Sequence, residues 1–299
     1  MNDRCERRFA VMGSDAHVLV VGGTPHHCCV AETRLGELEA KWSRFRSDSE
    51  VSRLNQARGA RTPISADTEM LLEAAITAHR HTDGSFDPSV LPALTSAGYL
   101  DDFAFVTDDD SSLPLVTVTV PGMDGIEVGD GRARLPAGVE FDPGGIGKGL
   151  AADIVVAELM ADGVAGVSVN VGGDVAVRGR PPVGDAWRTQ AQDVTEKGRI
   201  ISLTAGAVAT SSIERRRWGT DRHHIIDPTS GRPAAAGLAA VTVVAGAGWW
   251  AEALCTAFTV EGTRGARHLR VGDAAWGRTR DGRLCEFGAI DLLGTEDAA

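Results

Sequence analysis

The sequence lacks the features of a membrane-spanning or an exported protein. No stretch approaches the roughly 18 consecutive apolar residues that a membrane helix requires. The first 23 residues contain only short apolar runs, broken by Gly, Ser, Asp and His, without a secretory apolar region or a small-residue cleavage site. Cys5 does not make a lipoprotein signal, because no apolar stretch precedes it. We therefore expect no membrane segment and a cytoplasmic location.

Cysteine is sparse and shows no paired spacing. The five cysteines are Cys5, Cys28, Cys29, Cys255 and Cys285. Their odd number argues against a disulfide framework, and the CxxC pairs of zinc sites are absent. The adjacent Cys28 and Cys29 follow two histidines, which leaves a soft-metal site as an alternative. Neighbouring side chains at the start of a helix point in different directions, so this alternative is disfavoured.

Clustered positive charge is also scarce. The net charge is −11 and the isoelectric point is near 5.2, with basic residues scattered apart from the short segment ERRRW at 214–218. A nucleic-acid groove or an anionic membrane surface is therefore a poor interpretation. The chain has no internal repeat or long linker, and 43% hydrophobic residues in 299 can bury a substantial core. We expect a single domain over residues 1–299.

Helix and strand patterns alternate along the chain without a strict βαβ rhythm. Thr24 and Pro25 are typical of a helix start, as N-cap and first helical residue. The expected helices cover 25–45, 66–82, 150–163 and 249–262, and the expected strands lie at 17–23, within 115–140, and at 166–179, 199–210 and 239–248. Residues 107–114 and 180–186 look like surface loops, and the tail 294–299 is expected to fray. The pattern predicts an α+β fold with largely antiparallel sheet.

A glycine-rich turn precedes one of these helices. The stretch FDPGGIGKGLAADIVVAELMADG (141–163) crowds four glycines around Lys148 before an apolar run. Glycines there leave the first-turn N–H groups free, and the helix dipole favours an anion beside them. The spacing fits neither the P-loop nor the dinucleotide pattern. Taken alone, the segment is therefore either a tight connection or a phosphate site.

Seven separated motifs occur in one family order. They are WSRFRSDSEVSRLN, TDGSFDPSVLPAL, DPGGIGKGLAAD, VNVGGDVAVRG, ATSSIERR, HHIIDPTSGRP and AEALCTAF. In this order they resemble the ApbE-type FAD:protein FMN transferases, formerly described as thiamine-biosynthesis lipoproteins. The resemblance covers about residues 12–262. It implies a T-fold-like layered α+β architecture of antiparallel sheets and packed helices.

The resemblance also implies an activity. Such enzymes bind FAD and Mg²⁺, cleave the pyrophosphate, and transfer FMN to a Thr or Ser of an acceptor protein while AMP leaves. A metal ion and a lysine-bearing turn suit that chemistry, because both neutralise phosphate charge. Two alternatives remain: an FAD pyrophosphatase that gives FMN and AMP, and a protein that binds or carries FAD without turning it over.

Three residues match the metal ligands of the family. The resemblance assigns this role to the backbone carbonyl of Gly147 and to Glu252 and Thr256, which lie four apart and hence on one helix face. Glu252, which we also count as catalytic, replaces the usual Asp and is longer by one methylene than the family ligand. Lys148 is assigned to the phosphate, with an exposed lysine that covers apolar surface as the alternative.

Further residues are assigned to the flavin and the acceptor. Phe45 would stack on the isoalloxazine ring, unless it is a core aromatic. Asp87, before Pro88, would face the flavin cleft or only cap the next helix. His224 matches a family histidine that assists proton removal from the acceptor hydroxyl.

The turn NVGGD (170–174) is either a plain hairpin or a contact to adenosine and to the Gly-Lys turn. Asp227 is interpreted first as a turn residue and second as a ligand contact. Ser212 replaces a family glycine, which questions the local backbone. The full set expected at the cofactor is Met12, Phe45, Asp87, Asp142, Gly144, Gly145, Lys148, Asn170, Gly172, Gly173, Asp174, Ser211, His224 and Asp227.

Overall fold

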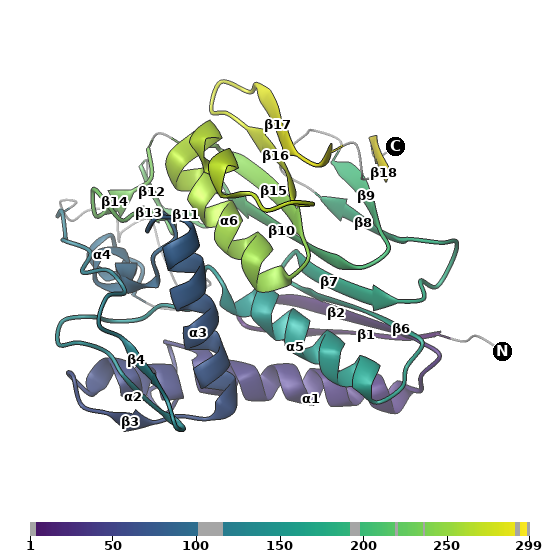
Figure 1. Ribbon diagram of the computed structural model, residues 1–299, viewed down its shortest axis with the longest axis horizontal. Helices are drawn as coiled ribbons and strands as arrows, with labels where there is room; N and C mark the ends of the chain where they lie inside the picture. Colours follow the sequence, from purple (N-terminus) through teal and green to yellow (C-terminus); the bar gives the residue numbers. More distant parts are fainter. Residues whose placement is uncertain are drawn as a thin grey trace.

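An eight-stranded sheet forms the centre of the molecule (Figure 1). The computed structural model describes residues 4–100, 116–191, 198–218, 221–235, 237–290 and 294–297. In spatial order the strands are β1 (Arg4–Val11), β2 (Ser14–Val21), β6 (Gly166–Val171), β7 (Asp174–Gly179), β10 (Gly206–Ser212), β15 (Ala240–Ala245), β16 (Ala274–Arg278) and β17 (Leu284–Gly288). Each neighbouring pair in this order is antiparallel. The predicted α+β class with antiparallel sheet is confirmed.

Three long helices pack on one face of this sheet (Figure 1). They are α1 (Pro25–Trp42), α5 (Gly147–Ala161) and α6 (Gly248–Glu261). The α1 start is as predicted, with Pro25 as the first residue and the N–H of Thr24 donating to His27 Nδ1 at 3.0 Å. Asp153 of α5 accepts hydrogen bonds from the N–H groups of Gly248 and Trp249 and so caps α6.

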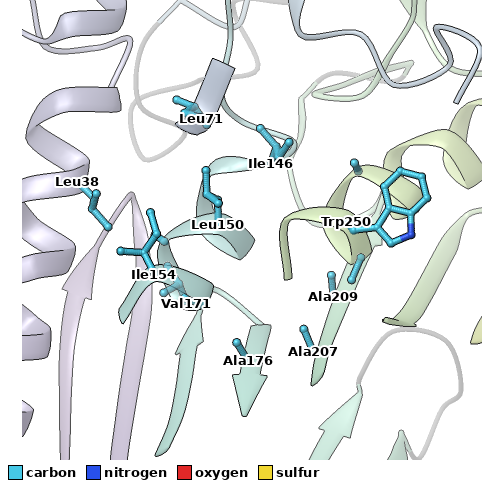
Figure 2. Packing of buried hydrophobic residues seen from close by; sticks show 14 of the residues in the cluster. Leu38, Leu71, Ile146, Leu150, Ile154, Val171, Ala176, Ala207, Ala209 and Trp250 are labelled. Carbon is cyan, nitrogen blue, oxygen red and sulfur yellow. The ribbon is translucent and has the colours of Figure 1, made fainter. Parts of the chain in front are cut away.

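Glycine lets α5 and α6 meet at their N-terminal ends. A Cβ on Gly149 would lie 2.3 Å from the carbonyl oxygen of Gly248. No side chain fits at that separation, so the close approach of the two helices depends on glycine. Figure 2 shows the packing beneath them: Leu150 of α5 lies close to Ile146, and Trp250 of α6 lies beside the strand that carries Ala209.

Smaller elements surround the central layers. The helices are α2 (Glu50–Gln56), α3 (Ala66–His81), the short 3-10 helix η1 (Pro88–Val90), α4 (Leu91–Ser96) and the 3-10 helix η4 (Gly262–His268). The remaining strands are β3 (Thr62–Pro63), β4 (Glu127–Gly129), β5 (Arg132–Arg134), β8 (Trp187–Ala191), β9 (Arg199–Leu203), β11 (Arg217–Trp218), β12 (Arg222–His223), β13 (Ile226–Asp227), β14 (Arg232–Pro233) and β18 (Gly294–Asp297). Within the described residues, no helix combines the length and the hydropathy needed to cross a bilayer.

Two local predictions need comment. The tail was expected to fray, but Gly294–Asp297 forms β18, which pairs antiparallel with β9. The prediction is wrong for these four residues, because strand pairing satisfies their backbone groups. The expected loop at 180–186 is confirmed between β7 and β8. The expected loop at 107–114 lies outside the described residues.

Candidate active site

A cleft lies at the end of the central sheet where two hairpin turns meet the start of α5. The first turn joins β1 to β2 through Met12 and Gly13, at φ +54° and +62°. The second joins β6 to β7 through Gly172 and Gly173. A Cβ on Gly172 would lie only 2.8 Å from Ser14 Oγ, so glycine is needed for the two turns to pack together. Both turns therefore bring backbone close to the cleft.

The cleft gathers most of the residues assigned to it from the sequence. Those that line it are Met12, Phe45, Asp87, Asp142, Gly144, Gly145, Gly147, Lys148, Gly172, Ser211, His224, Glu252 and Thr256. Apart from Met12, these residues come from all seven motifs, which confirms that the motifs converge in space. Their individual roles stay predictions.

A buried charge network forms the floor. Lys148 of α5 lies between two carboxylates: its Nζ is 2.5 Å from Glu252 Oε1 and also donates to Asp174. The other oxygen of Glu252 accepts the backbone N–H of Gly149 at 2.9 Å. The side chains of Asp174 and Glu252 are each 3% exposed, so the lysine is their main counter-charge. Lys148 is thus neither an exposed lysine nor an unpaired phosphate ligand.

The pKa values of this network follow from burial and charge. Burial raises the pKa of Glu252, and the nearby carboxylate of Asp174 raises it further, against the opposing effect of Lys148. Burial alone would lower the pKa of Lys148, but the two carboxylates outweigh it, so its pKa is raised. With all three groups ionised the network carries one net negative charge, which a bound cation would balance.

The glycine turn and α6 touch directly beside this network. A Cβ on Gly145 would lie 3.1 Å from Thr256 Oγ1 and 3.1 Å from the ring of Phe86. The glycine therefore lets the turn lie against the hydroxyl-bearing face of α6. The helix with Glu252 and Thr256 and the lysine-bearing turn share one side of the molecule, as the sequence interpretation requires.

Oxygen donors at this junction suit a hard divalent ion. Glu252 offers a carboxylate, Thr256 a hydroxyl and Gly147 a backbone carbonyl, the ligand types that Mg²⁺ prefers. Among the described residues, no three His, Cys, Asp or Glu side chains gather as a metal-binding group. A divalent ion must therefore use the hydroxyl and carbonyl oxygens as well as a carboxylate. In donor chemistry and in charge, the residues fit Mg²⁺.

His224 also lines the cleft and has a defined tautomer. Its Nδ1 is 3.3 Å from the carbonyl oxygen of Arg216, which can only accept, so Nδ1 carries the proton. Nε2 is left with its lone pair. Burial, together with the charge of Arg216, lowers the pKa of His224 to about 3. The imidazole is therefore neutral at physiological pH, with an unprotonated Nε2.

A pair of aromatic side chains also lines the cleft. Phe45 is 41% exposed and meets Tyr99 edge to face, with ring centroids 6.0 Å apart. The guanidinium of Arg44 lies 4.1 Å from the Phe45 ring centroid and 4.6 Å from that of Tyr99. The exposure of Phe45 excludes the alternative of a core aromatic. Its ring is available to a planar ligand in the cleft.

Two arginines that line the cleft were not predicted from the sequence as site residues. Arg215 and Arg216 belong to the basic segment ERRRW, which was noted only as a minor charge cluster. One guanidinium nitrogen of Arg216 lies 3.4 Å from Ser14 Oγ, and the described residues place no carboxylate within ion-pair distance of it. Since Lys148 is neutralised by carboxylates, Arg216 is the better candidate for a phosphate. Both arginines end the matched motif ATSSIERR (209–216), and that position was the available signal.

Four assigned residues do not line the cleft: Asn170, Gly173, Asp174 and Asp227. Asn170 points to the far face of β6, where it lines a separate groove with His17. Its side-chain oxygen accepts a hydrogen bond from the N–H of Gly173 and closes the hairpin, in agreement with the plain-hairpin alternative. Asp174 acts from beneath the cleft through Lys148. Asp227 accepts the N–H of Thr229, which confirms the turn.

Two local questions from the sequence are answered. Asp87 caps η1, accepting the N–H of Ser89 at 2.8 Å, so the capping role is confirmed. Ser212 lies in β10 without a positive φ, and its hydroxyl accepts the N–H of Glu214. The serine therefore occupies the family glycine position without backbone strain.

Comparisons with known proteins give consistent results. The model of the ApbE family matches residues 12–274. The FAD:protein FMN transferase of Treponema pallidum is 30% identical over 287 residues, which cover 86% of this chain and 78% of the relative. The enzyme of the same name from Salmonella typhimurium is 28% identical over 284 residues, covering 86% and 79%. The crystal structure of the Pseudomonas stutzeri flavinyl transferase ApbE in its apo form superposes with a TM-score of 0.80 at 27% identity, covering 99% of this chain and 97% of that one.

Proposed function

Because the chain belongs to the ApbE family, we propose that it is an FAD:protein FMN transferase that uses FAD and a divalent ion. FMN passes from FAD to a Thr or Ser hydroxyl of an acceptor protein, and AMP leaves. One observation carries the proposal: the glycine turn of α5 and the Glu252–Thr256 face of α6 meet in the cleft that also holds Phe45 and His224.

The cleft offers complementary surfaces to the two ends of FAD. The exposed ring of Phe45 provides a face for the isoalloxazine. The diphosphate belongs at the N-terminus of α5, where backbone N–H groups and the helix dipole favour an anion. Arg216 adds a cation there that can form charge-assisted hydrogen bonds to phosphate oxygens.

His224 acts as the base. Its Nε2 takes the proton of the acceptor hydroxyl as the hydroxyl oxygen attacks the phosphorus on the riboflavin side of FAD. The bond from that phosphorus to the bridging oxygen breaks, and AMP departs with the bridging oxygen. The lowered pKa of His224, about 3, leaves Nε2 unprotonated at neutral pH.

Glu252, Thr256 and the carbonyl of Gly147 would hold Mg²⁺. When bound, the ion supplies neutralisation of the charge that builds on the leaving phosphate. Lys148 and the N–H of Gly149 fix the Glu252 carboxylate by holding one oxygen each. Asp174 in turn positions Lys148. Glu252 is thereby oriented despite the extra methylene that distinguishes it from the family Asp.

The proposal is tested by separating flavin products. The chain is incubated with FAD and Mg²⁺, with and without an acceptor protein, and AMP and FMN are quantified by chromatography. Denaturing electrophoresis then detects flavin fluorescence on the acceptor. Fluorescent acceptor with matching AMP supports transfer. Free FMN in both tubes would show a pyrophosphatase, and bound FAD without any product would show a carrier. The cytoplasmic location stays a prediction.

A further inference from the structure

Two cysteines far apart in the sequence lie side by side outside the cleft. Cys5 of β1 and Cys28 of α1 place their sulfur atoms 3.2 Å apart. A disulfide has a sulfur–sulfur distance near 2.05 Å, so closing the gap needs a movement of only about 1 Å. The two elements are packed against each other, which holds the sulfurs in register.

We propose that Cys5 and Cys28 form a reversible disulfide that staples β1 to α1. The proposal does not depend on the flavin chemistry. It gives a role to one cysteine of the segment HHCC (26–29), for which a soft-metal site was disfavoured. The side chains there diverge: Cys28 is buried against Cys5, whereas Cys29 is exposed and accepts a hydrogen bond from Arg7 at 3.5 Å.

The two thiols differ in access, which sets the order of events. Cys28 is 2% exposed and Cys5 is half-buried, so a dissolved oxidant can reach only Cys5. Burial raises the pKa of Cys28 to about 12, so this thiol is not the one that first attacks a dissolved oxidant. Cys5 reacts first, and Cys28 resolves the product.

The chemistry balances with a small disulfide such as oxidised glutathione as the oxidant. The sulfur of Cys5, losing its proton, attacks the small disulfide and expels one glutathione, which takes that proton. The sulfur of Cys28, losing its proton, then attacks Cys5 and expels the second glutathione. Two protein thiols are oxidised by two electrons in total, and one oxidised glutathione becomes two reduced ones.

The staple has a mechanical consequence for the cleft wall. At the other end of β1, the N–H of Met12 donates to Glu39 of α1 at 2.7 Å, and both residues line the cleft. The strand and the helix are therefore already tied at the cleft end. A covalent bond at Cys5–Cys28 fixes the opposite end and closes a loop in the unfolded chain, which raises stability.

The test uses the full chain treated with oxidised glutathione. Free thiols are alkylated, and the protein is digested and analysed by mass spectrometry. We expect one linked peptide pair that joins Cys5 to Cys28, a rise in the melting temperature, and reversal of both by dithiothreitol. Cys285 and the buried Cys255 should not appear in any linked peptide pair, and they serve as internal controls.

Single variants make the outcome decisive. Cys29→Ser should leave the linked pair and the melting-temperature rise unchanged. Cys28→Ser should abolish both and leave a persistent glutathione adduct on Cys5; Cys28→Ala serves the same purpose if the serine disturbs the core. A link through Cys29, or glutathione adducts on wild-type Cys5 that never resolve, would overturn the proposal.

Discussion

The carboxylate of Glu252 on α6 accepts the backbone N–H of Gly149 in the first turn of α5, at 2.9 Å. One side chain thus joins the two helices whose N-terminal ends frame the cleft. The same carboxylate holds Lys148 through its other oxygen. The proposed metal ligand Glu252, the first turn of α5 and Lys148 are thereby coupled in one network.

Thr256→Val removes the hydroxyl donor at the α5–α6 junction but keeps the shape of the side chain. We expect metal-dependent flavin transfer to fall by at least about a hundredfold, because the ion loses a ligand. Thr259→Val is the matched control: Thr259 is buried on the same helix, and its hydroxyl donates only to the carbonyl of Cys255. Equal transfer rates in the two variants would rule out the assigned ligand.

Lys148→Met leaves Asp174 and Glu252 buried without their cation. We expect a loss of about 3–5 kcal/mol in the free energy of unfolding, measured by urea denaturation. Added Mg²⁺ should restore more stability to this variant than to the wild type, since the ion supplies the missing charge. Lys41→Met is the control, because its partner Asp67 keeps a second partner in Arg34. An equal loss of unfolding free energy in the two variants would show that Lys148 is not the main counter-charge of Asp174 and Glu252.

His223 gives the protein a defined acid sensitivity. Burial lowers its pKa to about 4 from an ordinary value of 6.5. Below pH 6.5 the unfolded chain binds a proton that the folded chain does not bind until about pH 4, so stability falls as the pH falls through this window. His223→Gln should make the dependence less steep, as measured by urea denaturation at several pH values, while His224, whose pKa is also lowered, still contributes. The same slope in both proteins would show that His223 is not held neutral.

Arg216→Ala removes the cation that no carboxylate of the described residues neutralises. We expect FAD to bind about ten- to a hundredfold more weakly, since hydrogen bonds to charged groups contribute about 1.5–3 kcal/mol. Titration of FAD fluorescence measures the change. Arg217→Ala serves as control, because Arg217 belongs to β11 and does not line the cleft. A similar loss of FAD affinity in both variants would show that the effect depends on overall charge and not on the position of Arg216.

Much of the fold could be predicted from local periodicity in the sequence. The helices α1, α3 and α6 were predicted because apolar residues recur with helical spacing and start signals such as Thr24–Pro25 are present. β1 was not predicted, since its sequence RCERRFAV is strongly charged. It forms the edge of the sheet, where one side of the strand is open to water and charges are tolerated.

The site was predictable as a set of motifs but not as a network. Lys148 is 26 residues from Asp174 and 104 from Glu252, so no local pattern reveals that it pairs with both. Asn170 was misplaced for a related reason: a strand sends alternate side chains to opposite faces, and only the register shows which face borders the cleft. Arg216 ends the matched motif ATSSIERR, but the motif alone does not show that its side chain lines the cleft.

The most direct test of the account is the mass of an acceptor protein after incubation with FAD and Mg²⁺, in parallel with wild type, Thr256→Val and His224→Ala. The account predicts an added FMN on a Thr or Ser of the acceptor with wild type, one AMP released for each FMN attached, and strongly reduced labelling with either variant. Full labelling by both variants, or AMP release without any flavin on the acceptor, would contradict it.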